Sequence, residues 1–287
     1  MVYYDVNYIC DINSKSEICI CDRKSNKNIC LIGGCRITPF LNYLANDNYF
    51  DSYNILGILV FNNEMINLSK NIIDNEEKKK EIYNTTILIC EYIINFDYFN
   101  TSPKTDKNIF KIKESFDIKI LLPNYQDPCI YTADLILHKD NIQSDFINKY
   151  LNKAISLEEF SKILKDTKTN EIKRYYDIIF KSDLPELFDF VIKNIDNNRI
   201  AYTINHPSNI LFIKMHEIIL KKFFNREIPD NVLQINNNHE FLNSEISILT
   251  FYDKECLHFN INEEYLNEEE SIKYLLKCIS QKNRFFL

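Results

Sequence analysis

Two segments of the 287-residue sequence combine residue types that could carry out nucleophilic chemistry. In the first, Cys35 directly follows Gly33 and Gly34, although the chain contains only three glycines. An ionised cysteine is a nucleophile, and glycines let a ligand approach the backbone closely. In the second, His206 precedes Pro207, and a neutral histidine is the most frequent general base near pH 7. Cysteine and histidine act as nucleophile and base when their side chains meet.

The elements predicted around Cys35 favour a reactive thiol. Residues 28–32 form an apolar strand that ends at the glycines, and Pro39 suits the first turn of a following helix. Cys35 is therefore expected at the carboxyl edge of a sheet and near a helix amino terminus. There the helix dipole favours the thiolate, and backbone N–H groups bind an oxyanion or a phosphate. The alternative is a tight turn followed by a buried structural cysteine, which spacing alone slightly favours.

The elements predicted around His206 are similar. Residues 199–203 predict a strand and residues 207–224 a long helix, so His206 is expected at a helix amino terminus. That position disfavours the imidazolium and keeps the ring neutral. The alternative is that His206 and Ser208 only cap the helix, and for an isolated histidine that alternative is favoured. Because both segments lie at strand-to-helix junctions, we expect both to face one crevice, which favours the catalytic interpretation.

The order of elements predicts an α/β fold. Residues 55–61 form a continuous apolar run, which is typical of a strand buried on both faces, and further buried strands are predicted at 86–94 and 117–122. Helical patterns lie between them. We therefore expect a mainly parallel central sheet flanked by helices. A single domain is predicted for residues 1–287, with an N-terminal β-hairpin extension in 1–27 and a helical insertion in 140–197.

Further elements are predicted outside the central sheet. The hairpin pairs residues 2–11 with 17–22, and helices are expected at 62–81, 157–165, 170–181, 185–196 and 268–280, with a late strand at 245–252. Ser156 and Glu159 form a capping box at the start of one of these helices.

Composition excludes several classes of protein. The net charge of −7 argues against a nucleic-acid partner, and no apolar run reaches the length of a membrane span. Residues 1–7 lack the features of a signal peptide, so the nine cysteines are expected to be free thiols in the cytoplasm, or in a host cytoplasm if the chain is viral. Cys19 and Cys21 lack zinc-ribbon spacing, so no metal is expected.

Three motifs resemble one known family. Ile32-Gly33-Gly34-Cys35-Arg36 is similar to the Gly-Asn-Cys-Gln motif of the WcbI-type polysaccharide-biosynthesis acetyltransferases. Residues 120–125 with Pro128 resemble its mid-chain proline-containing strand segment, and Asn205-His206-Pro207-Ser208 resembles its Asn-His-Pro-Ser segment. The motifs occur in the family's order, and the resemblance covers residues 28–225.

The resemblance implies a function. Members of the family bind coenzyme A or acetyl-CoA and transfer an acetyl group to a sugar of a surface glycan. By this resemblance Cys35 and His206 are the catalytic cysteine and histidine. Gly34 replaces the usual asparagine, and Arg36 replaces the usual glutamine and could pair with a phosphate of coenzyme A. The residues expected to bind the cofactor are Gly33, Gly34, Arg36, Asn205 and Ser208.

Further residues and two other functions remain open. Glu91 ends a predicted strand and could orient His206, or it could be a partly exposed strand end; Asn124 and Tyr125 are candidates for the acceptor pocket. The acceptor is expected to be an amino or hydroxyl group of a deoxy sugar that could be nucleotide-linked. The alternatives are a hydrolase that uses the same pair on water (a sugar deacetylase or thioesterase) and a non-catalytic carbohydrate-binding protein. The residues predict no particular oligomeric state.

Overall fold

The protein is described from a computed structural model. The described residues are 8–9, 16–21, 23–60, 85–91, 116–123, 130–137, 144–203, 206–238, 241 and 247–285. They belong to two compact units. The first comprises Met1–Tyr125, Ile179–Leu187 and Phe212–Leu242, and the second comprises Gln126–Ile178, Phe188–Leu211 and Asn243–Leu287. Each unit has its own core, and the prediction of a single domain stays a prediction.

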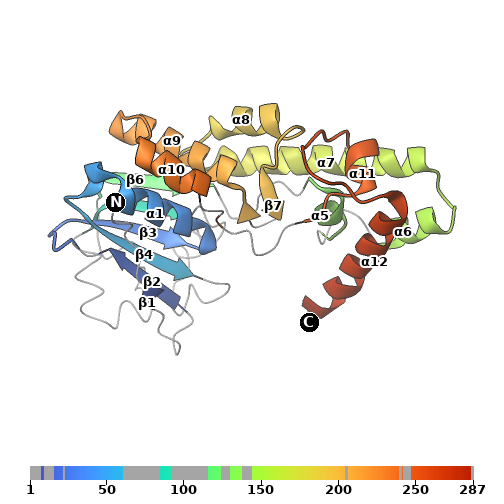
Figure 1. Cartoon of the computed structure of the whole chain (residues 1–287), viewed down its shortest axis with the longest axis horizontal. Helices are drawn as coiled ribbons and strands as arrows, with labels where there is room; N and C mark the ends of the chain where they lie inside the picture. The colour runs from blue at the N-terminus through green and yellow to red at the C-terminus, as the bar shows by residue number, and fades with distance from the viewer. Residues whose placement is uncertain are drawn as a thin grey trace, which may run out of the picture. The chain divides into compact units, whose positions relative to one another are not determined.

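A six-stranded sheet forms the centre of the first unit (Figure 1), in the order β1-β2-β4-β3-β5-β6. Its strands are β1 (Tyr8–Ile9), β2 (Ser16–Cys21), β3 (Asn28–Gly33), β4 (Asn54–Val60), β5 (Thr85–Glu91) and β6 (Ile118–Leu122). The four strands from β4 to β6 are parallel, whereas β1 pairs with β2 and β2 with β4 in antiparallel fashion. The predicted hairpin is confirmed, and its second strand extends the central sheet.

The inner parallel strands β3, β4 and β5 form where the sequence is mostly apolar, whereas the outer strand β6 contains the exposed Lys119. Every residue of β3 is buried, and Ile87 to Glu91 of β5 are buried as well. Strands covered on both faces need such runs, because no face is left for polar side chains. The predicted mainly parallel α/β sheet is therefore confirmed. The helix predicted at 62–81 lies outside the described residues.

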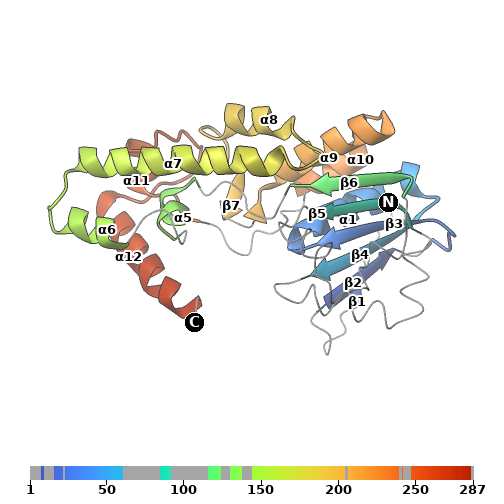
Figure 2. The ribbon, with the colours of Figure 1, turned by 180° about the vertical axis from the view of Figure 1, so that it is seen from behind.

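Helices cover the sheet of the first unit (Figures 1 and 2). Its helical elements are η1 (Cys35–Ile37), α1 (Thr38–Asn46), η2 (Asn48–Phe50), most of α9 (Asn209–Phe224) and α10 (Asp230–Asn238). Helix α1 packs closely on β4 at Gly57, where an added Cβ would lie 2.5 Å from Leu41 Cδ1. The glycine therefore lets the helix approach the strand.

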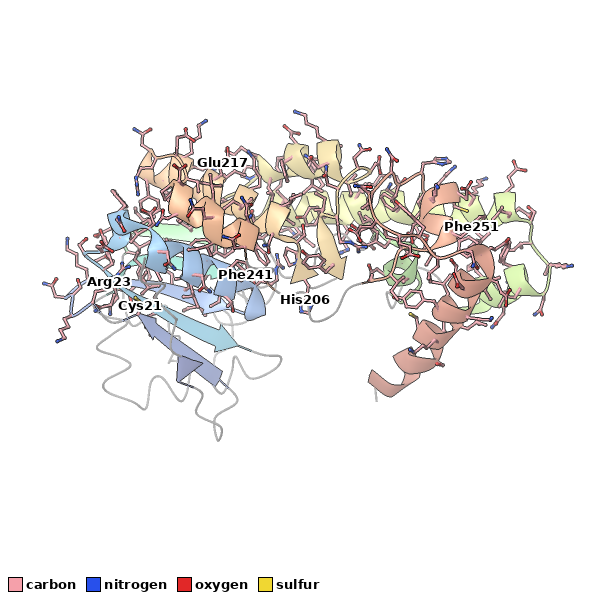
Figure 3. All side chains as sticks on the ribbon, viewed as in Figure 1. Cys21, Arg23, His206, Glu217, Phe241 and Phe251 are labelled. Carbon is pink, nitrogen blue, oxygen red and sulfur yellow. The ribbon has the colours of Figure 1, made fainter. Side chains whose placement is uncertain are left out.

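Aromatic side chains fill the core between α1 and α9. Phe40 and Phe212 meet edge to face, and Tyr43 does the same with Phe241, which Figure 3 labels. His216 lies among these rings with its ring centroid 5.0 Å from that of Tyr43, and only 1% of its surface is exposed. Its Nε2 atom has no hydrogen-bond partner among the described residues. His216 is therefore a packed core residue of the first unit.

His216 makes the stability of the first unit sensitive to acid. Burial lowers the pKa of its imidazole to about 3, whereas an unfolded histidine titrates near about 6.5. Below that value the unfolded chain gains a proton that the folded protein lacks, so stability falls as the pH drops. The slope is about 1.4 kcal/mol per pH unit. We expect His216→Leu to abolish this loss, so that urea unfolding at pH 5 and pH 7 differs by about 2 kcal/mol less than in the wild type.

A surface histidine provides the control for this measurement. His258 is exposed and has a φ of 59°, a conformation that asparagine tolerates. His258→Asn is expected to keep the wild-type difference between pH 5 and pH 7. An equal change in both variants would contradict the role assigned to His216.

The second unit is mainly helical. Its helices are α5 (Thr132–Leu137), α6 (Ser144–Leu151), α7 (Leu157–Ile179), α8 (Leu187–Asn194), α11 (Phe251–Glu255) and α12 (Glu268–Phe285). The prediction of two helices at 157–165 and 170–181 is wrong, because α7 is continuous (Figure 2). The hydroxyl groups of Thr167 and Thr169 donate to carbonyl oxygens four residues earlier, so both threonines are accommodated within the helix. The Ser156–Glu159 capping box is confirmed.

The late strand predicted at 245–252 is wrong for the described residues. Residues 247–250 have no regular structure, and Phe251 begins α11. Thr250 caps this helix: its hydroxyl accepts the N–H of Asp253, and the Asp253 carboxylate accepts the N–H of Thr250. A reciprocal capping box defines a helix start, so Phe251 and Tyr252 belong to α11 and not to a strand.

Candidate active site

The turn after β3 carries Cys35 at the topological switch point of the sheet. Strand β3 pairs with β4 on one side and with β5 on the other, so the strand order of the sheet reverses its direction at β3. Residues Cys35–Ile37 form one 3₁₀ turn, closed by the N–H of Ile37 donating to the oxygen of Gly34 over 3.1 Å. Open α/β sheets bind ligands outside the carboxyl ends of their strands at such a point. The predicted backbone position of Cys35 is confirmed.

Glu91 ends β5 at the same edge and binds the turn directly. Its Oε2 accepts the N–H of Gly34 over 3.0 Å, and its Oε1 lies 3.9 Å from Nε of Arg36. Only 3% of Glu91 and 5% of Arg36 is exposed. Burial raises the pKa of the Glu91 carboxyl, and the Arg36 charge and the Gly34 N–H oppose that rise. The observed partners of Glu91 are therefore within the Cys35 turn, and its predicted role in orienting His206 stays a prediction.

Gly33 is required by this packing. An added Cβ would lie 2.7 Å from Ile37 Cγ2 and 2.8 Å from the Cγ and Cδ atoms of Glu91. Side-chain carbon atoms do not approach so closely, so any other residue would displace either the turn or the carboxylate. The sequence suggested that the glycines admit a ligand. The structure shows that Gly33 also makes room for the buried Glu91.

His206 lies in a short strand of the second unit (Figure 3). Strand β7 (Ala201–Thr203) pairs antiparallel with β8 (His206–Pro207), apart from the central sheet, and α9 starts at Asn209. Two predictions are therefore wrong. The helix does not start at Pro207, and the strand before His206 does not end at the same kind of junction as β3. The reason is local pairing: Thr203 lies opposite His206, and the chain turns back on itself before the helix begins.

Ser208 closes this hairpin. Both its N–H and its hydroxyl donate to the carbonyl oxygen of Ile200, each over 2.9 Å, and 3% of the residue is exposed. Its hydroxyl therefore has a structural partner. The roles predicted for Ser208 and Arg36 in binding coenzyme A stay predictions, and Asn205, Asn124 and Tyr125 lie outside the described residues.

A cluster of buried polar residues is hydrogen-bonded to β7. The N–H of Ser247 donates to the oxygen of Tyr202 over 2.8 Å, and its hydroxyl donates to Asp134 over 2.9 Å. Arg199 donates to the oxygen of Ser247 and binds Glu263 through two nitrogens. Burial raises the pKa of the Asp134 carboxyl to about 7, the Ser247 hydrogen bond opposes the rise, and the Asp253 charge adds to it.

Sequence reasoning missed this cluster. Its one signal is Asp134, an acidic residue inside the apolar stretch 129–137. An acidic residue in such a stretch indicates a buried carboxylate that needs partners. Its hydrogen-bond partner Ser247 lies 113 residues further along the chain, so sequence spacing does not identify it.

The predicted residues thus fall into two groups. Gly33, Gly34, Cys35, Arg36 and Glu91 are brought together in the first unit, whereas His206 and Ser208 belong to the second. The shared crevice stays a prediction. Among the described residues, no group of three or more metal-binding side chains is present, and none of the helices is both long and apolar enough to cross a membrane.

Comparison with known proteins gives one fold relationship. No family model matches the chain, and no curated protein matches its sequence. A solved structure of WcbI, a novel polysaccharide biosynthesis enzyme, covers 90% of this chain and 90% of its own with a TM-score of 0.54. The chain shares the fold of WcbI. That structure is of the native protein without a disulfide bond between coenzyme A and a cysteine of WcbI. At 14% identity the likeness shows the fold, and membership of the WcbI family stays a prediction.

Proposed function

We propose that the protein is an acetyl-CoA-dependent acetyltransferase that acts on an amino or hydroxyl group of a sugar in glycan biosynthesis. The observation that carries the proposal is the position of Cys35 at the switch point of the parallel strands of the sheet. Two further observations support it. WcbI, which shares the fold, is a polysaccharide biosynthesis enzyme, and its structure is described as lacking a disulfide bond between coenzyme A and a cysteine. Three segments that resemble the motifs of the family also occur here in the family's order.

The turn fits the reacting end of the donor. A cysteine in a tight turn at the sheet edge suits attack on a thioester, because the backbone N–H groups of such turns stabilise developing negative charge. The side chains of Arg36 and Ser208 have partners within the protein, Glu91 and the Ile200 oxygen. The proposal therefore assigns the phosphate groups of coenzyme A to neither side chain.

The proposed acetyl transfer takes place in two steps, first to Cys35 and then to the acceptor. Coenzyme A supplies the acetyl group as a thioester, the activated donor. His206 takes the proton of Cys35, and the thiolate attacks the carbonyl carbon. A bond to the Cys35 sulfur forms, the bond to the sulfur of coenzyme A breaks, and that sulfur leaves with the proton from His206. The acceptor then gives a proton to His206 and attacks the acetyl carbon, which returns Cys35 as a thiolate.

A thermal-shift titration tests the proposal. Coenzyme A and acetyl-CoA at about 100 times their dissociation constant should stabilise the protein by about 2.7 kcal/mol, and the melting temperature should rise by about 5 °C. 4′-Phosphopantetheine and 3′,5′-ADP, the two halves of the ligand, serve as controls and should give smaller shifts. Stabilisation by nucleotide sugars alone would instead indicate a binding protein. Acetate release at full rate without any acceptor would indicate a hydrolase, and both results contradict the proposal.

A further inference from the structure

A buried pair of opposite charges involves the two residues next to Cys35 in the chain. Arg36 is the next residue, and Glu91 holds the preceding residue, Gly34, through its N–H. Consecutive Cα atoms lie only about 3.8 Å apart, so both charges are anchored one residue from the thiol. Because both residues are at most 5% exposed, salt screens their charges weakly.

Stability alone explains this pair poorly. A buried ion pair gains little over an apolar pair of the same size, because both charges lose their hydration. Here the ion-pair distance is 3.9 Å, which is longer than a charge-assisted hydrogen bond of about 2.8 Å. The carboxylate also requires glycine at position 33. The lost hydration of the two charges and the need for glycine at position 33 both occur at the turn that carries Cys35.

We propose that Glu91 and Arg36 are a positioning pair that fixes the Cys35 turn and sets the charge balance in which the Cys35 thiol ionises. Glu91 holds the turn by accepting the Gly34 N–H, and its negative charge offsets that of Arg36. Without Glu91, the arginine charge would stabilise the thiolate; without Arg36, the carboxylate would disfavour it. This inference rests on the proposed role of Cys35 as the reacting thiol.

The test measures ionisation of Cys35 without any donor or acceptor. The rate of Cys35 alkylation by iodoacetamide is followed from pH 5 to pH 10 by peptide mass spectrometry. The thiolate forms a bond to the methylene carbon and iodide leaves, so the pH midpoint of the rate reports the thiol. Glu91→Gln keeps an oxygen for the Gly34 N–H and removes the charge. We expect it to lower the midpoint by about 0.5–1.5 units.

The partner variant should act in the opposite direction. Arg36→Met should raise the midpoint by a similar amount, and the double variant should return it to within about 0.3 units of the wild type. A purely structural role does not produce opposite shifts that cancel. Other titratable groups on the neighbouring elements, Cys90 on β5, Lys119 on β6 and the nearby Asp183, remain unchanged in all three variants.

A second glutamate–arginine pair, in which the glutamate is buried, provides the control. On α7, Glu171 is 2% exposed and its carboxylate lies 2.8 Å from Nε of Arg174. Glu171→Gln should leave the Cys35 midpoint unchanged. Shifts of the same sign in both turn variants, no shift, or a folded wild type whose Cys35 is never alkylated would each overturn the inference. If Glu91→Gln does not fold, an unchanged midpoint in Arg36→Met overturns it alone.

The result is separable from the proposed function. Failure of coenzyme A to bind would contradict the acetyltransferase proposal and leave the alkylation midpoints measurable. Unshifted midpoints in a protein that binds coenzyme A would overturn only the role of the pair.

Discussion

Replacing Cys35 by alanine is expected to lower kcat/KM for acetyl transfer by about a thousandfold, equivalent to about 4 kcal/mol of transition-state stabilisation. The physical reason is that alanine cannot form the bond to the acetyl carbon. Incubation of the wild type with acetyl-CoA and no acceptor should add the mass of one acetyl group to the Cys35 peptide, and the variant should show none. Steady-state kinetics and peptide mass spectrometry measure the two effects.

A buried cysteine of the same unit provides the control. Cys90 is 1% exposed at the end of β5, and burial raises the pKa of its thiol to about 12. It is therefore a neutral thiol at pH 7, and Cys90→Ala should retain acetyl transfer and the acetylated Cys35 peptide. A Cys35→Ala enzyme with full activity and no acetyl-enzyme in the wild type would exclude the covalent route and favour direct attack by the acceptor.

His206→Ala is expected to lower kcat/KM by about 10²–10⁴-fold, the usual contribution of a general base. The acidic limb of the pH–rate profile should also disappear, because that limb reports protonation of the base. His206 is half-buried in β8, so alanine leaves the hairpin backbone pairs in place. The measurement is kcat/KM between pH 5 and pH 9 for the wild type and the variant.

Ser208→Ala distinguishes a base from a structural residue. It removes the hydroxyl that donates to the Ile200 oxygen and should cost about 1 kcal/mol of stability. Because His206 remains, the acidic limb of the profile should persist even if the rate falls. A His206→Ala enzyme that behaves like Ser208→Ala, with lower stability and an unchanged pH profile, would show that His206 only supports the hairpin.

The parallel sheet was predictable because its signal is local. Strand burial on both faces favours mostly apolar runs, and those runs place β3 to β6 within a few residues of their observed bounds. The capping box at Ser156 and the helix α12 were predictable for the same reason, since side chains three or four residues apart meet on a helix.

Long-range partners were not predictable from the same sequence. Residues 199–203 have strand-forming composition, but whether a strand joins a sheet or folds back on its neighbour depends on which edge is free in space. Thr203 pairs with His206, so the helix after Pro207 starts two residues later than its proline suggests. Thr250 and Asp253 likewise convert an apparent strand into a helix start.

The position of Cys35 after a buried strand and two of the three glycines could be predicted, because burial pattern and glycine placement are properties of neighbouring residues. The residues that surround the Cys35 turn follow from the tertiary fold. Glu91 lies more than fifty residues from Gly34 in the chain, and parallel pairing of β3 with β5 brings its carboxylate to the turn. Strand order and register determine which residues become partners of a buried charge, and neither can be read from spacing along the chain.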